Sequence, residues 1–315
     1  MKTEKKKNFT FVVTSYNQEK VILENLESIK FQIENFGKDI NCSLLICDDC
    51  SKDNTVEVAK RWLDINKDLF YEYKIIVPEA NKGIVQNTIR GIQNTKTDDF
   101  KILAADDLYY KNNIFEFMNS EYNFVVTPII RINNQGTIVK DLKREYFAYI
   151  VNKNRVKKIM KKTIEYTMPF HTPGVIWKKY LFDQSTINEM KPYSTIEDVP
   201  LWKNILNKDE TKVCFCAKPY ILYGTSNGVS HNPNNPKREQ YNLEKIKLHN
   251  EIWWKNNKII YKAYFYILKK IYEKIYFNFR EVQLINNEYK KEIVEANEFY
   301  KMIQKRVEEY NSTYI

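Results

Sequence analysis

The first hundred residues alternate short apolar runs with longer segments of helical periodicity. Four short runs predict buried strands, at residues 9–14, 43–47, 74–77 and 101–104. The segments between them carry apolar residues three or four positions apart, as in residues 19–36, which is the spacing of a helix with one buried face. Because parallel strands need such crossovers, the repeated units predict an α/β fold with a mostly parallel sheet flanked by helices.

Polar residues follow the ends of all four predicted strands. They are Tyr16 with its neighbours, the pair Asp48 and Asp49, the turn Asn81-Lys82-Gly83, and the pair Asp106 and Asp107. Ligands of parallel sheets bind outside the carboxyl ends of the strands. Asp48 or Asp49 can accept hydrogen bonds from a uracil N–H or from ribose hydroxyls, and Tyr16 offers an aromatic face. The pair at 106–107 supplies hard oxygen ligands for Mg²⁺ or Mn²⁺ shared with phosphate oxygens.

Each of these motifs also has a purely structural explanation. The acidic pair at 48–49 can cap a helix, and the pair at 106–107 can be an ordinary acidic turn. The pair at 197–198 places negative charge where a helix N-terminus stabilises it. Their joint occurrence, in this order along one chain, favours a functional site over separate structural roles.

The pattern changes in the second half of the chain. Residues 124–132 and 137–139, joined by a polar turn, predict a hairpin, and paired strands are predicted near Val213 and Ile221. From about residue 231 the sequence is rich in Asn and Pro and then helical to its end. We therefore expect a main domain at residues 1–235 and a helical C-terminal extension at 236–315.

Charge and cysteine content narrow the class of protein. A net charge of +10 indicates an anionic partner, which a nucleotide, a membrane surface or a nucleic acid would satisfy. The basic N-terminus lacks the apolar core of a signal peptide, and no apolar run approaches the roughly 18 residues of a spanning helix, so we expect a cytoplasmic protein. Five cysteines, an odd number, predict reduced thiols, and Cys47 and Cys50 lack the second Cys pair of a zinc site.

The predicted extension mixes aromatic and basic residues. From Trp253 and Trp254 to Arg280, tyrosines and other apolar residues alternate with lysines at helical spacing. One explanation is an amphipathic helix in peripheral contact with the inner face of an anionic membrane. The alternative is a helix that packs on the main domain and leaves its lysines in water.

Several motifs together resemble glycosyltransferase family 2. Residues 11–17 followed by Glu19, and residues 46–55 with Asp48-Asp49-Cys50-Ser51, resemble the opening of that family. Asn81-Lys82-Gly83 with Asn87 is similar to its Asn-x-Gly…Asn helix start. Residues 104–107 resemble its metal-binding acidic element, and residues 196–198 followed by Leu201-Trp202 resemble its Glu-Asp motif. The ordered set covers roughly residues 8–230.

The resemblance implies a GT-A fold and an inverting, metal-dependent transferase of hexosyltransferase type that uses a nucleotide sugar, here a UDP-sugar. It assigns Asp198 as the catalytic base and Asp107 with His231 as metal ligands for Mn²⁺ or Mg²⁺. The donor-binding residues that it implies are Thr14, Tyr16, Glu19, Asp48, Asp49, Lys82, Gly83, Asn87 and Asp106. Two departures from the family pattern are Ala104, in place of the first Asp of the metal element, and Gln86, in place of a frequent Arg.

Both loop histidines, His171 and His231, are explained most simply as solvated side chains. His231 is the better candidate of the two for a role in the site, since residues 224–231 resemble a segment that covers the donor in the family.

The implied acceptor is a hydroxyl of a glycan or lipid-linked glycan in bacterial surface polysaccharide synthesis. Two other classes fit part of the sequence. The net charge of +10 and the many Tyr and Lys residues suit a non-enzymatic basic RNA-binding protein, but no RNA-recognition signature is present and strand-end acidic pairs repel phosphate. A nucleotidyltransferase on a similar sheet would need a Gly-rich basic loop after the first strand, which is absent from the sequence. We therefore expect no nucleic-acid partner.

Overall fold

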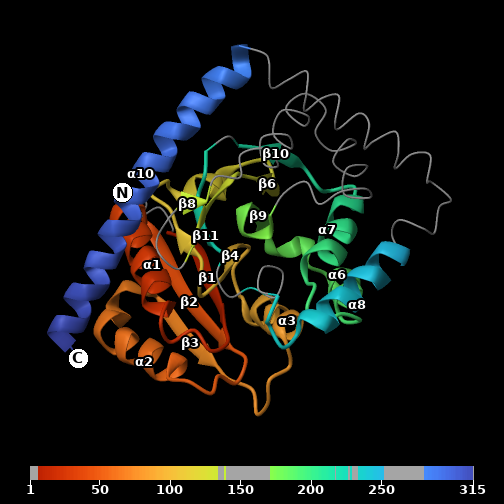
Figure 1. The fold of residues 1–315 in the computed structure, drawn as a ribbon, viewed down its shortest axis with the longest axis horizontal. Helices are drawn as coiled ribbons and strands as arrows, with labels where there is room; N and C mark the ends of the chain where they lie inside the picture. Colours follow the sequence, from red (N-terminus) through yellow and green to blue (C-terminus); the bar gives the residue numbers. More distant parts are fainter. Residues whose placement is uncertain are drawn as a thin grey trace.

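The structure, a computed structural model, describes residues 6–133, 138–139, 171–216, 218–225, 228, 233–251 and 280–314 of the chain. Its centre is a seven-stranded sheet with the strand order β10-β6-β9-β4-β1-β2-β3. A four-stranded sheet with the order β5-β11-β7-β8 lies beside it (Figure 1). Helices cover both faces of the larger sheet, so the molecule is an α/β protein, as predicted.

The four predicted strands form one half of the larger sheet. They are β1 (Lys7–Ser15), β2 (Ile40–Asp48), β3 (Glu72–Ile76) and β4 (Asp99–Ala104). All three pairings among them are parallel. They are connected by α1 (Ile22–Phe36), α2 (Thr55–Asn66) with the short 3-10 helix η1 (Lys67–Leu69), and α3 (Ile84–Asn94). The parallel arrangement expected from the alternating pattern is therefore confirmed.

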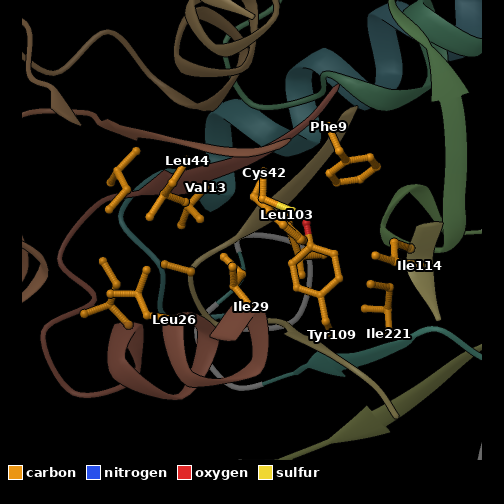
Figure 2. Packing of buried hydrophobic residues seen from close by; sticks show 14 of the residues in the cluster. Phe9, Val13, Leu26, Ile29, Cys42, Leu44, Leu103, Tyr109, Ile114 and Ile221 are labelled. Atoms are coloured by element: carbon orange, nitrogen blue, oxygen red, sulfur yellow. The ribbon is translucent and has the colours of Figure 1, made fainter. Parts of the chain in front are cut away.

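The two faces of this sheet are covered by different helices, because successive strand residues point to opposite sides. Phe11 and Val13 of β1 are buried with apolar residues of α1 and α2, whereas Val12 is buried with those of α3 and α7 (Asp198–Asn207). In Figure 2, Val13 and Leu44 lie above Leu26 and Ile29 of α1. The strands are thus buried on both faces, which explains their continuous apolar runs.

The second half of the larger sheet differs from the prediction. The segment 124–132, expected as one strand of a hairpin, forms β6 (Phe124–Val126) in the larger sheet and β7 (Ile129–Ile132) in the smaller one. The chain changes sheet at Thr127-Pro128, where Pro128 has no amide to donate to a ladder. Of these two strands, β7 pairs antiparallel with β8 (Ile138–Val139), which is the pairing expected for a hairpin, whereas β6 does not take part in it.

The expected pairing between strands near Val213 and Ile221 is wrong. β10 (Val213–Phe215) pairs with β6, whereas β11 (Ile221–Gly224) pairs with β5 (Leu108–Tyr109) and β7. The chain leaves one sheet where the Cys216 amide donates to Val126 and enters the other where the Tyr220 carbonyl accepts from Tyr110. Between β6 and β4 lies β9 (Val175–Lys178), antiparallel to both.

The other helices among the described residues lie around the sheets. They are η2 (Ile114–Asn119), η3 (Thr172–Gly174), η4 (Lys179–Leu181), α6 (Gln184–Met190), α8 (Arg238–His249) and α10 (Arg280–Tyr314). Figure 1 shows α10 (blue) lying along α1. Its Tyr300 hydroxyl donates to Glu24 at 3.0 Å, and its Arg306 Nε donates to Glu27 at 3.1 Å. α10, which belongs to the predicted extension, therefore packs on residues of the predicted main domain.

Two expectations concern properties of the chain beyond its fold. All five cysteines are free of disulfides, as expected. None of the helices in the described ranges has the length and apolar character needed to cross a membrane. The aromatic and basic residues 253–279, on which the membrane hypothesis depends, lie outside the described residues, as does His231.

Candidate active site

The carboxyl ends of β1, β2 and β4 meet at one edge of the sheet. Ser15 is in register with Asp48, and Thr14 is in register with Ala104. Main-chain hydrogen bonds continue past the strands, from the Asp49 amide to Ser15 at 2.9 Å and from the Ala105 amide to Thr14 at 2.9 Å. Thr14, a predicted donor-binding residue, is itself buried. The strand-end residues are therefore brought together as the parallel topology requires.

Asp48 organises the turn after β2. Its buried carboxylate accepts hydrogen bonds from the Ser15 hydroxyl at 2.9 Å, and from the amide and hydroxyl of Ser51 at 2.7 and 2.5 Å. Between them, Cys50 adopts a left-handed backbone with φ of 65°. These contacts are those of a turn-stabilising carboxylate, so Asp48 shapes the loop on which Asp49 lies.

Asp49 connects this loop to the start of α3. Its carboxylate accepts from the Lys82 amide at 3.0 Å and the Gly83 amide at 2.6 Å. Gly83 has a φ of 88°, and a Cβ there would lie 2.9 Å from the Ser194 carbonyl, so both conformation and space require glycine. The Lys82 side chain is exposed. Lys82 and Gly83 thus contribute through their backbone.

Arg90 belongs to the same group of residues and was not predicted. It donates to the Asn87 side-chain oxygen at 2.6 Å and lies 3.8 Å from the Asp49 carboxylate. Asn87, predicted to bind the donor, donates to the Cys47 carbonyl at 2.6 Å. Arg90 lies three positions after Asn87, which places both on one face of α3. The spacing of three positions from Asn87 is the feature of the sequence that could have identified Arg90. Position 86, where the family often has Arg, carries Gln in this chain.

Tyr16 and Glu19 have different roles in the loop after β1. The Glu19 carboxylate accepts from the Asn54 amide at 2.9 Å, which ties this loop to the start of α2. Tyr16 is 39% exposed, and the Lys237 ammonium lies 5.7 Å from its ring centroid. Lys237 also donates to the Asn81 side chain at 2.9 Å. The exposed face of Tyr16 therefore lies beside Lys237, which was not predicted from the sequence.

The acidic pair after β4 is held by β11. Asp107 is 1% exposed, and its carboxylate accepts from the Gly224 amide at 2.8 Å. A Cβ at Gly224 would lie 2.3 Å from the Asp106 carbonyl oxygen, so this approach requires glycine. Burial raises the pKa of Asp106 to about 6. Burial, followed by the charge of Asp106, raises the pKa of Asp107 well above its usual value.

Asp198 begins α7, and its carboxylate accepts from the Val199 amide at 2.7 Å. Burial, followed by the negative charge of Asp198, raises the pKa of Glu197 to about 8. Burial also raises the pKa of Tyr223, with further contributions from the charges of Asp107, Asp106 and Glu197, in that order. Three carboxyl groups that are far apart in sequence, those of Asp106, Asp107 and Glu197, therefore act on one side chain of β11.

His171 contacts the same side chain. Its ring stacks on that of Tyr223 with centroids 5.7 Å apart, and its Nε2 lies 2.9 Å from the Arg131 guanidinium. Neither Tyr223 nor Arg131 was predicted, because the pairing of β11 with β7 in the smaller sheet was not expected from the sequence. Within the described part of the chain, no three His, Cys, Asp or Glu side chains gather as a metal cluster.

Similar proteins identify the fold of this site. The structure of S. aureus TarS 1–349 in complex with UDP has a TM-score of 0.52 and 17% identity, over 95% of this chain and 91% of that chain. The same protein in complex with UDP-GlcNAc has a TM-score of 0.50 and 16% identity, over 77% and 67% of the two chains. At these identities the likeness concerns the fold alone, and it confirms the GT-A architecture.

Sequence comparison identifies the family. A curated relative from Rickettsia felis (strain ATCC VR-1525 / URRWXCal2), described as an uncharacterized glycosyltransferase, is 25% identical over 203 residues. The match covers 63% of this chain and 30% of the relative, so the chain spans less than a third of the relative's length. Residues 10–185, more than half of the chain, match Glycosyl transferase family 2. The chain therefore belongs to glycosyltransferase family 2.

Proposed function

We propose that the protein transfers a sugar from a UDP-sugar to an acceptor hydroxyl, with inversion at the anomeric carbon. The observation that carries this proposal is that the strand ends leading to Asp49 and to the acidic pair 106–107 meet at one edge of the sheet. The charge of Glu197, next to Asp198, acts on the same Tyr223 side chain as the charges of Asp106 and Asp107. The strand ends can thus bind the nucleotide, while a separate carboxylate, that of Asp198, takes the proton of the acceptor hydroxyl. Family membership argues against the RNA-binding and nucleotidyltransferase alternatives.

The nucleoside would bind where the loops after β1, β2 and β3 meet. Tyr16 supplies an exposed aromatic face, and Asp49 supplies a carboxylate held by backbone amides. Thr14, Glu19, Asp48 and Asn87 support this end by fixing the backbone. We propose uracil as the base, a choice supported by the complexes of TarS with UDP and UDP-GlcNAc.

The acidic pair suits a divalent metal in its donor chemistry. Carboxylate oxygens are preferred by Mg²⁺ and Mn²⁺, and the Asp106 side chain has no hydrogen-bonding side-chain partner among the described residues. Asp107 is engaged by Gly224, so we propose Asp106 as the direct ligand and Asp107 as a contributor of charge. His231 remains a proposed ligand, the second in this set. When bound, the metal would neutralise the charge of the diphosphate.

Asp198 is the proposed catalytic base. Burial and the charge of Asp198 both raise the pKa of Glu197, so Glu197 favours its protonated form and is the poorer base of the two. Asp198 would take the proton of the acceptor hydroxyl as its oxygen forms a bond to the anomeric carbon. The bond from that carbon to the diphosphate breaks, and its electron pair leaves with UDP. This single displacement inverts the configuration.

The acceptor proposal is a hydroxyl of a glycan or lipid-linked glycan in bacterial surface polysaccharide synthesis. The net charge of +10 supports attraction to an anionic acceptor or membrane surface. Peripheral contact at the inner face of the membrane, in a cytoplasmic protein, is part of this proposal. Such contact predicts that the protein sediments with anionic liposomes at low salt, less so at high salt, and not with neutral liposomes.

The function is tested by screening nucleotide sugars for thermal stabilisation with Mn²⁺ and then measuring release of the nucleoside diphosphate. We expect a UDP-sugar to stabilise the protein and to be consumed. Asp198→Asn keeps the shape of the side chain and removes its basicity, so kcat should fall by roughly 10²–10⁴ while UDP still binds. Normal turnover of this variant at saturating acceptor would move the base to Glu197. Consumption of no nucleotide sugar would contradict the function.

A further inference from the structure

Helix α8 carries a buried carboxylate that is saturated with hydrogen bonds from one short segment. Glu244 is 5% exposed. One of its oxygens accepts from the amide and hydroxyl of Ser194 at 2.8 and 2.7 Å. The other accepts from the amide and hydroxyl of Thr195 at 2.8 and 2.7 Å. Four donors from two consecutive residues thus converge on a single side chain.

Glu244 is charged under physiological conditions. Burial raises its pKa, but hydrogen bonds from Thr195, Gln240 and Ser194 outweigh this effect and lower the pKa to about 2. Hydrogen bonds to an ionised carboxylate are about twice as strong as those between neutral groups. The backbone at residues 194–195 is therefore held firmly to α8.

The segment held by Glu244 lies between the two halves of the site. The Ser194 carbonyl faces Gly83, where a Cβ would approach it to 2.9 Å, and the Gly83 amide donates to Asp49. Two positions after Thr195 comes Glu197, followed by Asp198. The position of the acidic pair relative to the nucleotide end thus depends on the segment that Glu244 holds.

The helix that carries Glu244 is anchored at several other points. Leu248 is buried in the core cluster that contains Val199 and Trp202 of α7. The Tyr193 hydroxyl donates to Glu251 at 2.7 Å. α8 also lies beyond residues 10–185, which match the family, so the family pattern does not account for Glu244.

We propose that Glu244 is a positioning residue for the Glu197–Asp198 pair, acting through its hydrogen bonds to Ser194 and Thr195. The inference rests on the proposed role of Asp198. Glu244 does not touch substrate. It fixes the direction from which Asp198 approaches the acceptor hydroxyl, and a displacement of about 1 Å at a reacting group can cost 10²-fold in rate.

The first test replaces Glu244 with Gln, which has the same shape but puts an NH₂ group where one oxygen accepts from Ser194 or from Thr195, and removes the negative charge. We expect kcat for release of UDP from the accepted UDP-sugar to fall by about 10- to 100-fold, with the Kd for UDP changed by no more than about 2-fold. Glu239→Gln is the matched control, because Glu239 is an exposed carboxylate on the same helix, and it should leave kcat unchanged. A kcat for Glu244→Gln within about 2-fold of wild type would overturn the proposal.

A second pair of variants addresses the donor side and guards against misfolding of the first. Thr195→Val removes the hydroxyl donor at nearly constant shape, whereas Thr195→Ser keeps it. The Val variant should lower kcat without weakening UDP binding, and the Ser variant should retain most of the activity. A purely structural role for the contact predicts equal losses of kcat and of UDP affinity in the Val variant, which would contradict positioning.

Hydrogen exchange separates this inference from the proposed function, since it needs no turnover. In Glu244→Gln, the amides of residues 194–199 should exchange faster, while those of β1 and β2 keep their wild-type rates. Unchanged exchange at 194–199 would refute the positioning role even in an active enzyme. If the wild type consumes no nucleotide sugar, the function fails, and the exchange result still decides whether Glu244 holds this segment.

Discussion

The guanidinium of Arg90 lies 3.8 Å from the carboxylate of Asp49, and both side chains are largely buried, at 16% and 2% exposure. Arg90 is held in turn by the Asn87 side chain at 2.6 Å. Asp49 therefore has a positive neighbour on α3 in addition to the amides of Lys82 and Gly83. This arrangement surrounds a buried carboxylate with hydrogen-bond donors and a positive charge, beside a site proposed to bind a nucleotide.

Arg90→Ala should weaken both the fold and nucleotide binding. It removes a charged donor from Asn87 and the cation beside Asp49, which costs about 1–3 kcal/mol of unfolding free energy. Urea denaturation and UDP titration measure the two effects. The control is Arg61→Ala, because Arg61 pairs with Glu57 on the exposed face of α2 at 3.9 Å, a pair that contributes less than about 1 kcal/mol. Equal behaviour of the two variants would rule out a special role for Arg90.

The metal proposal distinguishes the two members of the acidic pair. Asp106→Asn should abolish both turnover and the thermal stabilisation by Mn²⁺, because the direct ligand loses its negative charge. Asp107→Asn keeps an oxygen that can accept from the Gly224 amide, so the fold should survive while metal affinity falls more modestly. Thermal shift with increasing Mn²⁺ compares the variants. Turnover that persists in Asp106→Asn and in EDTA would contradict metal dependence.

Much of the site follows from the sequence, because its motifs lie at strand ends and the alternating pattern predicts where strands end. Asp49 and Asp106 lie just after β2 and β4 for that reason, whereas Asp198 begins α7. The sequence predicted one strand over residues 124–132, whereas the chain changes sheet at Thr127-Pro128 and forms two. A continuous apolar run has the same periodicity in both cases, so it does not distinguish them. Tyr223 was missed because only the tertiary structure brings it within reach of the charges of Asp106, Asp107 and Glu197.

Glu197 predicts a pH dependence of stability. Its pKa is raised from 4.5 to about 8 in the folded protein, so the folded state binds more protons than the unfolded state between these values. Stability contributed by the protonated form is complete below about pH 4.5 and is lost as the pH rises through about 8. Glu197→Gln should remove this loss, so the variant should gain stability relative to wild type as the pH rises. Urea denaturation at pH 5 and pH 8.5, with EDTA present, tests it, and parallel curves for the two proteins would contradict the assignment.

Substitution of Ile303 tests whether packing of α10 stabilises the position of the acidic pair 106–107. It is fully buried in a cluster with Leu108 and Tyr110, which lie one and three positions after Asp107, and with Leu222 of β11. Ile303→Ala leaves a cavity there and should cost about 2–5 kcal/mol of unfolding free energy. The matched control is Val294→Ala on the same helix, where the side chain is 57% exposed and the cost should be below about 0.5 kcal/mol.

The two α10 variants also separate support of the fold from support of the site. If the cluster positions Asp107, the folded Ile303→Ala protein should bind Mn²⁺ more weakly than Val294→Ala, because β5 and β11 relax where Gly224 holds the carboxylate. Calorimetric titration with Mn²⁺, well below the unfolding temperature of both variants, provides the comparison. Equal Mn²⁺ affinities together with a large loss of stability would limit α10 to a structural role. Equal stabilities would show that α10 is not part of the cooperative core.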